Sequence, residues 1–393
     1  MNPRGYDTII IGGGIMGAWI ALELAERGLE RILLLEKSYP GAGSSGKSGA
    51  ILRQHYSHDT TIRMARHSLG AYGRFHEEHG IDIGFRRAGM VFITHASQLA
   101  ALEANVALQR SNGVESNVIG REELLELEPT GIFTEEDRAA WEPEAGYVHP
   151  VRAVHACLEV AKRRGVEVRV GAAARAIEIV GGRVTGVRLD GGERVPAPHV
   201  VNAAGPWAKG LMRGVSVGLP LRVVRPEQAF FEPPADARDR RTIYGDLVTG
   251  LYWKPEAAGW TRVGQLSYDE DPEVDPDHYD EGVSGAFIGR CRRGISERLP
   301  AYRNSPSWGG CGALYTVTPD AHPLIGAVPG YTGLWLVSGF SGHGFKMGPA
   351  VGRGVAALIA GGDPGPLDPA FFAVDRFDRN APVATRYAYG ILG

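Results

Sequence analysis

Three glycines with the spacing Gly12-x-Gly14-x-x-Gly17 constrain the fold of this chain more than any other feature. The apolar run Thr8–Ile11 precedes them, and apolar residues at helical spacing follow over Ala18–Arg27. In such a turn the first glycine closes the bend and the second lets the backbone approach a pyrophosphate. The third lets the helix pack closely on the strand. The helix N-terminus then offers N–H groups and a partial positive charge to phosphates. The pattern predicts the strand–turn–helix unit of a dinucleotide-binding domain, and the alternative is a glycine-rich turn without a ligand.

A second predicted strand, Arg31–Leu35, ends in an acidic residue at the position where a ribose is usually bound. Glu36 lies 36 − 17 = 19 residues after Gly17, where a carboxylate can accept from ribose hydroxyls. Strand, helix and strand together indicate a doubly wound, Rossmann-like α/β domain. The candidate cofactor contacts in this unit are Gly12, Gly14, Ile15, Met16, Gly17, Glu36 and Lys37.

Two later segments also end predicted strands in small residues. Val200–Trp207 would let a strand end pass close to a bound adenosine or diphosphate, which favours FAD over NAD, although an ordinary strand-to-helix turn has the same composition. Gly339–Lys346 follows a strand and opens a helix, so its N–H groups could stabilise negative charge on a reduced flavin. These segments and the Gly/Ser-rich loop 40–49 supply the other candidate contacts, namely Ser44, Ser45, Lys47, Ser48, Ala204, Gly205, Trp207, Gly339, Gly342, His343, Gly344, Phe345 and Lys346.

The α/β segments occur in three blocks separated by two insertions. We expect a discontinuous FAD-binding domain of residues 1–85, 149–219 and 320–377. A strand-rich α+β substrate domain of residues 86–148 and 220–319 is inserted into it, and residues 378–393 form a C-terminal tail. Helices are predicted at 59–79, 96–112, 121–128, 151–164 and 351–359.

Composition excludes several classes of protein. The formal net charge of -3 does not indicate a nucleic-acid-binding surface. The three cysteines, Cys157, Cys291 and Cys311, lie far apart without metal-ligand spacing, which fits a reduced, cytoplasmic setting and no metal site. The apolar stretch Ile15–Leu24 is too short and too mixed to span a bilayer, and we expect no signal peptide.

In this order, these motifs resemble those of the D-amino-acid oxidase superfamily of flavoproteins, most closely its sarcosine oxidase and glycine oxidase branch. The resemblance runs nearly end to end and includes Gly43–Ser45, Ile51–Tyr56, Tyr315–Asp320 and Pro323–Gly326. It implies FAD-dependent oxidation of the C–N bond of a small amino acid or N-substituted glycine. A hydride would pass to the flavin, and the imine product would hydrolyse in water. The electron acceptor, oxygen or another carrier, stays open, as does a homo- or hetero-oligomeric state. One alternative is a dehydrogenase subunit of a hetero-oligomer of proline, opine or dimethylglycine type, and another is a flavin-binding scaffold without activity.

The resemblance also implies roles for individual residues. Arg53 matches an arginine that binds the substrate carboxylate, for which its planar fork is suited, and Lys346 matches a second carboxylate-binding cation. Tyr252 and Tyr315 match pocket tyrosines. The alternatives are an Arg53 paired with a nearby aspartate and tyrosines that only pack in a core.

The chain departs from the family pattern near the flavin. Monomeric sarcosine oxidases attach FAD through a cysteine where this chain has Ala313, and Cys311 lies two residues too early, so we expect non-covalent FAD. Gly46 and Ala50 stand where the family has a histidine and an arginine. Arg262 falls where those oxidases carry a lysine that activates oxygen, which predicts that oxygen is a mediocre electron acceptor.

Overall fold

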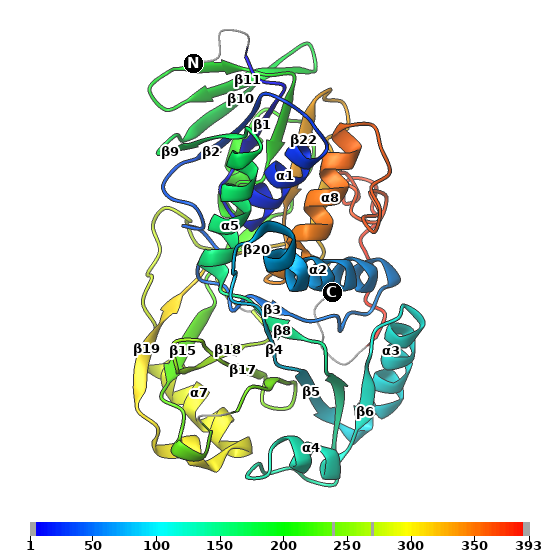
Figure 1. The fold of residues 1–393 in the computed structure, drawn as a ribbon, viewed down its shortest axis with the longest axis vertical. Coiled ribbons are helices and arrows are strands. Elements are labelled where there is room, and N and C mark those ends of the chain that lie inside the picture. The colour runs from blue at the N-terminus through cyan, green and yellow to red at the C-terminus, as the bar shows by residue number, and fades with distance from the viewer. Residues whose placement is uncertain (1–4, 238–239, 269–270, 388–393) are drawn as a thin grey trace.

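Two large sheets organise the protein. The computed structural model describes residues 5–237, 240–268 and 271–387. The strands of the first sheet are β1 Thr8–Ile11, β2 Ile32–Glu36, β9 Glu167–Val170, β13 His199–Asn202, β21 Leu324–Ala327 and β22 Leu334–Ser338. They lie in the order β21-β22-β13-β1-β2-β9, and all neighbours are parallel except β21 and β22. Figure 1 shows this sheet in the upper part of an elongated molecule.

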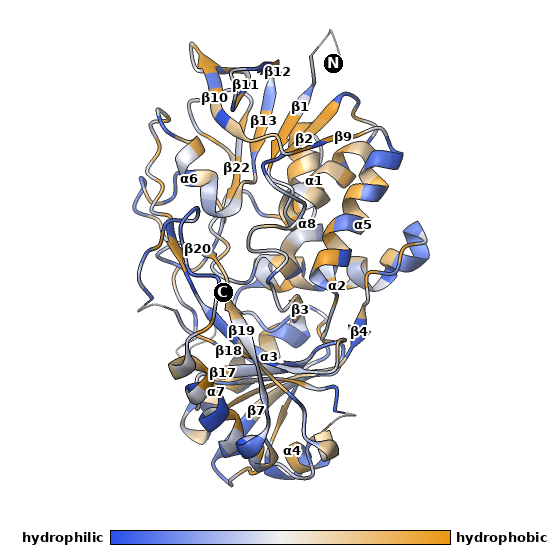
Figure 2. Ribbon diagram, turned by 90° about the vertical axis from the view of Figure 1, so that its left-hand side faces the viewer, coloured by the Kyte–Doolittle hydropathy of each residue, from blue (hydrophilic) through white to orange (hydrophobic). Residues whose placement is uncertain are grey.

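Both faces of the six-stranded sheet are covered, which explains why its strands β1 and β2 are buried and almost entirely apolar. Ile10 and Leu34 share a buried cluster with the helix layer of α1 Ile15–Glu26, α5 Pro150–Arg163 and α8 Gly348–Ile359. Ile9 and Leu33 face the opposite side. There they pack against a three-stranded antiparallel sheet made of β10 Ala174–Val180, β11 Arg183–Leu189 and β12 Arg194–Pro196. Figure 2 shows the apolar character of β1 and β2 between these layers.

The second sheet has eight strands. They are β5 Met90–His95, β6 Asn117–Ile119, β7 Asp137–Glu142, β15 Glu227–Phe231, β16 Ile243–Asp246, β17 Leu251–Pro255, β18 Thr261–Gln265 and β19 Ser307–Gly312. Their order is β19-β15-β18-β17-β16-β5-β7-β6. The parallel pair β5–β16 joins strands from two ranges that are far apart in the chain.

Smaller strands and further helices complete the fold. The small strands are β3 Ile51–Leu52, β4 Arg86–Arg87, β8 Gly146–Tyr147, β14 Arg222–Val224 and β20 Tyr315–Val317. The other helices are α2 Asp59–His79, α3 Leu99–Ser111, α4 Arg121–Leu127, α6 Ala208–Leu211 and α7 Gly285–Arg298. Single 3₁₀ turns are η1 Ala96–Gln98, η2 Gly205–Trp207, η3 Ala235–Ala237, η4 Pro300–Asn304 and η5 Phe345–Met347. Figure 1 shows β3, β4 and β8 between the upper and lower parts of the molecule.

The expected fold class is confirmed, with two local differences. Helix α7 lies in the range expected to be strand-rich. It was not predicted because glycines and arginines interrupt its apolar pattern. Ser284 caps the helix by accepting from the Phe287 N–H at 3.2 Å. The predicted helix 96–112 begins as a 3₁₀ turn and becomes α-helical only at Leu99. The domain boundaries given above stay a prediction.

Candidate functional site

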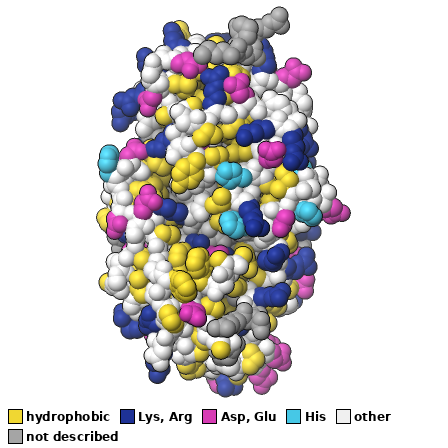
Figure 3. All heavy atoms as spheres, turned by 60° about the vertical axis from the view of Figure 1, so that its left-hand side comes forward, with side chains coloured by type: hydrophobic (Ala, Val, Ile, Leu, Met, Phe, Trp, Pro, Cys, Tyr) yellow, Lys and Arg dark blue, Asp and Glu magenta, His cyan; other side chains and the backbone are white. Residues whose placement is uncertain are grey.

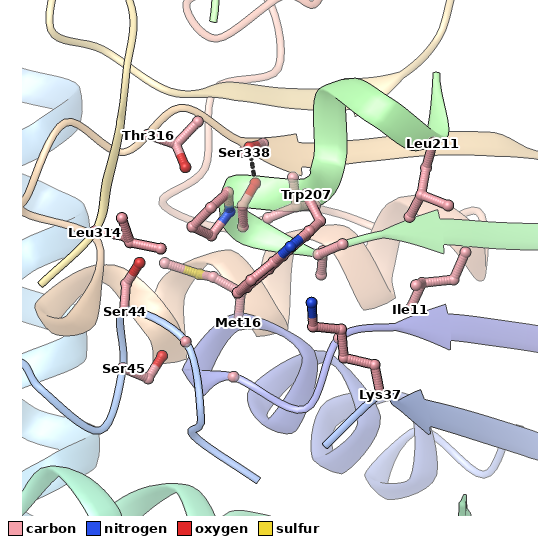
Figure 4. A pocket seen from close by; sticks show the side chains of 18 of the residues that line it. Ile11, Met16, Lys37, Ser44, Ser45, Trp207, Leu211, Leu314, Thr316 and Ser338 are labelled. Carbon is pink, nitrogen blue, oxygen red and sulfur yellow. Dashed lines mark hydrogen bonds between the residues drawn. The ribbon is translucent and has the colours of Figure 1, made fainter. Parts of the chain in front are cut away.

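A cavity of about 600 Å³ opens at the carboxyl ends of the parallel strands β1, β2, β13 and β22. This is where α/β sheets of this kind bind ligands. Figure 4 shows side chains from several of these strand ends around the cavity. The predicted cofactor contacts among its lining residues are Gly12, Gly14, Ile15, Met16, Glu36, Lys37, Ser44, Ser45, Ser48, Ala204, Gly205, Trp207, Gly339, Gly342, Gly344 and Phe345.

The glycine turn leaves no room for side chains. Gly12 has φ +112°, and a Cβ there would lie 2.5 Å from the carbonyl oxygen of Ala203 on the next strand end. Gly17 does not line the cavity. A Cβ at Gly17 would lie 1.9 Å from the Gly12 carbonyl oxygen, so this glycine allows α1 to approach β1. The first helical N–H, that of Ile15, donates to Ser45 Oγ at 3.0 Å.

Glu36 lies at the end of β2 with its carboxylate oriented by the backbone. Its two oxygens accept from the N–H groups of Gly13 and Ser38, both at 2.8 Å. The side chain is nearly buried but lines the cavity. Each carboxylate oxygen keeps a further lone pair that can accept from a hydroxyl group. Together with the cradle around Gly12 and the N-terminus of α1, this donor and acceptor set fits a dinucleotide such as FAD.

A second, smaller cavity of about 120 Å³ adjoins the first. Five residues line both cavities: Ser48, Tyr315, Ser341, Gly342 and Phe345. A cofactor that fills the large cavity up to this shared wall would therefore face the small one. Four predicted catalytic residues, Arg53, Lys346, Tyr252 and Tyr315, meet in the small cavity although they come from four separate parts of the chain.

Two cations line this small cavity. Arg53 is 9% exposed, donates to the His55 carbonyl, and holds its guanidinium 4.2 Å above the ring of Tyr56. Lys346 is 8% exposed, and within the described part of the chain its ammonium has no hydrogen bond or ion pair. Burial and, second, the charge of Arg53 hold the pKa of Lys346 well below its usual value. An anionic group in the cavity would relieve both effects.

The pocket tyrosines are neutral hydrogen-bond donors. Shielding from water raises the pKa of both Tyr252 and Tyr315 above the usual phenol value. Tyr268, which the sequence motifs did not indicate, also lines the cavity, donates to the Ser341 carbonyl, and packs edge-on against Tyr315 at 5.2 Å. Phe92 also lines the small cavity and was not predicted. An aromatic residue in a strand carries no sequence signal that distinguishes a cavity wall from a core.

His343 lines the small cavity and not the large one. Its Nδ1 lies 3.3 Å from the Tyr56 hydroxyl, and its Nε2 lies 2.8 Å from the Ala321 carbonyl oxygen. Burial and the nearby Lys346 hold its pKa well below the usual value, so the ring is neutral. These contacts hold the His343 ring against Tyr56 and Ala321, away from the cavity expected to hold the cofactor.

Behind Arg53 lies a buried carboxylate, Glu142, on β7. It accepts from the Gln54 N–H at 2.8 Å and approaches His55 Nδ1 to 3.6 Å. Burial raises the pKa of Glu142 to about 7 and lowers that of His55 to about 3. Neither residue lines the small cavity, so both support the Arg53 segment from behind.

Two other predicted site cations lie outside both cavities. Lys47 Nζ donates to Tyr279 OH at 2.7 Å and to Glu281 Oε2 at 2.8 Å. Arg262 is buried, is paired with Glu256, and donates to the Lys47 carbonyl at 3.0 Å.

Glu256 also binds a second cation, the fully buried Lys254, at 3.0 Å. Burial lowers the pKa of Lys254 to about 8. Cys311 and Ala313 likewise line neither cavity.

None of the helices in the described residues is both long and apolar enough to cross a membrane. On the face shown in Figure 3, basic and acidic side chains are interspersed rather than gathered by sign.

Comparison with known proteins agrees with this geometry. The chain is 26% identical over 381 residues to the 4-methylaminobutanoate oxidase (formaldehyde-forming) of Paenarthrobacter nicotinovorans. The aligned part covers 95% of this chain and 46% of the relative. The chain thus spans about half the length of that relative. It is 27% identical over 363 residues to the human peroxisomal sarcosine oxidase, covering 88% and 90% of the two chains.

Among solved structures, the L-proline dehydrogenase of P. horikoshii matches with a TM-score of 0.88 and 27% identity, covering 96% of this chain and 98% of that one. The family model described as "FAD dependent oxidoreductase" matches residues 7–358. This match confirms the expectation of FAD, and the chain belongs to the family of FAD dependent oxidoreductases.

Proposed function

We propose that the protein oxidises the C–N bond of a small amino acid or N-substituted glycine whose carboxylate binds between Arg53 and Lys346. One observation carries the proposal: two buried cations meet in a small cavity that shares a wall with the dinucleotide cavity. The names of the relatives support it, since sarcosine, proline and 4-methylaminobutanoate are all amino acids with a secondary amine.

The charge of the cavity favours an anionic ligand. A buried ammonium without a partner is costly, and an Arg fork beside it increases the cost. Among the described residues that line the small cavity there is no Asp or Glu, so the cavity wall offers no anionic partner to Lys346. A carboxylate can accept from the guanidinium and the ammonium together.

The size and walls of the cavity favour a small substrate. Its volume of about 120 Å³ is about a fifth of the roughly 600 Å³ of the dinucleotide cavity. Phe92, Tyr252, Tyr268 and Tyr315 form much of the wall. All four rings exclude water from the amine end, and Tyr252 and Tyr315 offer neutral hydroxyl groups to it.

The same residues direct the chemistry. FAD, when bound, supplies the two-electron acceptor for the C–N oxidation. Arg53 and Lys346 fix the carboxylate and so orient the reacting carbon toward the shared wall at Ser48 and Tyr315. With no carboxylate in the wall to hold an ammonium, the substrate amine binds neutral and its nitrogen lone pair stays available. Substrate oxidation therefore rises with pH through one ionisation of the amine.

Anaerobic bleaching of the flavin tests the proposal. Sarcosine, glycine, proline, D-amino acids and longer N-substituted glycines form the panel, and sarcosinamide is the matched control that lacks the carboxylate. We expect at least one carboxylate substrate to bleach the flavin and its amide to fail. Arg53→Ala should weaken binding of that substrate about ten- to a hundredfold, because a hydrogen bond to a charged group contributes about 1.5–3 kcal/mol. Failure of every amine to bleach the flavin would instead favour a flavin-binding scaffold.

The identity of the electron acceptor belongs to the proposal as well. Arg262 forms an ion pair with Glu256, so its charge is not available to promote the reaction of reduced flavin with oxygen. This favours the dehydrogenase alternative with a carrier other than oxygen. A cytoplasmic location and a homo- or hetero-oligomeric state are further parts of the proposal. The rate at which the purified, reduced protein reacts with air separates an oxidase from a dehydrogenase.

A further inference from the structure

Residues 271–284, which precede α7, reach the large cavity at Asp277. Residues 274–282, which we call the strap, are fixed at both ends. At one end the Val274 N–H donates to the Val223 carbonyl at 2.8 Å. At the other end the Gly312 N–H donates to the Glu281 carbonyl at 2.9 Å. The middle of the strap is thereby held out toward the first βαβ unit.

The crest of the strap contributes Asp277 to the lining of the dinucleotide cavity. Its Oδ1 lies 2.6 Å from Lys37 Nζ and 2.9 Å from Trp207 Nε1. The Lys37 ammonium also lies 3.8 Å above the Trp207 ring, and Figure 4 shows these two side chains together at the cavity. The hydrogen bond from Lys37 lowers the pKa of Asp277, so the carboxylate is charged at neutral pH.

A second contact fastens the strap to the loop that contains Ser44 and Ser45. Lys47 follows the loop residues Ser44 and Ser45 that line the cavity, and it binds Tyr279 OH at 2.7 Å and Glu281 Oε2 at 2.8 Å. Two lysines of the N-terminal region thus hold two acidic residues of the strap. The turn is also braced internally, since Asp275 Oδ1 accepts from the Asp277 N–H at 2.9 Å.

We propose that the strap is a clasp that retains the adenosine half of FAD, with Asp277 as its retaining residue. The proposal rests on the placement of the ribose at Glu36, the neighbour of Lys37 in the chain. In this proposal the cofactor leaves the cavity past the strap, which requires Asp277 to separate from Lys37 and Trp207. Because the Asp277 and Lys37 side chains are 53% and 37% exposed, salt can compete with this contact.

The clasp acts on cofactor retention and not on the reacting group. The strap residues, all of them described, lie outside the small cavity that contains Arg53 and Lys346. Changes in the strap should therefore alter the release of FAD without altering the binding of the substrate carboxylate.

The test measures release of FAD from the purified holoprotein as the flavin recovered in a spin-filter filtrate over time. Asp277→Asn keeps the size of the side chain and removes its charge. We expect release at least about threefold faster, since an exposed ion pair contributes up to about 1 kcal/mol, or roughly fivefold. Raising NaCl from about 0.05 M to about 0.5 M should accelerate release from the wild type more than from this variant.

Two further variants keep the test decisive. Glu281→Gln breaks the second fastening at a side chain that is 70% exposed, so it should fold normally and also speed release. Asp7→Asn breaks a surface ion pair of similar exposure, 38% and 39%, away from the cavity, and should match the wild type. If Asp277→Asn and Glu281→Gln both release FAD at the wild-type rate, the strap is not a clasp. Anaerobic bleaching by substrate reports separately on the proposed function, because it does not depend on the release rate.

Discussion

Lys346 provides the sharpest test of the proposed anion site, because the structure predicts opposite effects on stability and on binding. The change Lys346→Met removes the ammonium and keeps an unbranched side chain of similar length. In the ligand-free protein this ammonium is buried beside Arg53, and no described residue neutralises it. We therefore expect Lys346→Met to stabilise the ligand-free protein and to weaken the binding of carboxylates.

The expected magnitudes follow from burial. Replacing buried ionic groups by a well-packed apolar side chain is often neutral or stabilising by about 1–4 kcal/mol. Losing the charge-assisted hydrogen bond to a bound carboxylate costs about 1.5–3 kcal/mol, or roughly ten- to a hundredfold in Kd.

The pH dependence of stability has a definite sign. The pKa of Lys346 in the folded state lies below its value of about 10.4 in the unfolded chain. Between those two values the unfolded chain binds more protons, so the free energy of unfolding of the wild type rises with pH across that window. In Lys346→Met this contribution disappears, so the advantage of the variant is largest at low pH and shrinks as pH rises.

Two measurements check the prediction. Urea unfolding of the holoprotein with excess FAD, at about pH 7 and about pH 9, gives the stability. Titration with acetate, followed by the flavin absorbance, gives the carboxylate affinity. Lys162→Met, on the exposed face of α5, is the matched control and should change neither quantity. A variant that is less stable than the wild type and binds acetate equally well would refute the anion site, because the ammonium would then have a structural role.

Four further predictions use other parts of the structure. The raised pKa of Glu142 makes the stability of the wild type fall as pH rises from about 4.5 to 7. Glu142→Gln should remove this fall, and melting temperatures measured at several pH values test the difference. Gly17→Ala should bind flavin less well and be less stable, since its Cβ would lie 1.9 Å from a backbone oxygen. In the control Gly285→Ala the new Cβ meets nothing within 4 Å, so its free energy of unfolding in denaturant should stay within about 1 kcal/mol of the wild-type value. Acid precipitation should leave the yellow flavin in the supernatant, as expected from Ala313; colour in the pellet would mean a covalent bond. Stopped-flow mixing of the reduced protein with aerated buffer should show slow reoxidation, and a rate as fast as that of dedicated oxidases would exclude the dehydrogenase alternative based on Arg262.

Local sequence determined the cofactor-binding frame of this protein. The turn at Gly12–Gly17 and the carboxylate of Glu36 could be predicted because close backbone approach and a strand end impose their requirements on neighbouring residues. Helix α2 was predicted with its observed bounds, Asp59–His79, since its apolar residues recur at helical spacing and Gly80 ends it in a left-handed conformation. The resemblance to known flavoproteins added Arg53, Lys346 and the two tyrosines, which the structure brings together in one cavity.

Tertiary structure alone decided which charges reach that cavity and which are neutralised elsewhere. Arg262 and Lys47 have the same formal charge as Arg53 and Lys346, yet they turn away to Glu256 and Glu281. Asp277 reaches the cofactor cavity from the strap, more than 200 residues after the glycine turn, and the sequence around it carries no motif. The physical reason is the range of the interactions. Backbone conformation and periodicity act over a few residues, whereas the partner of a charged side chain is set by chain segments that meet only after folding.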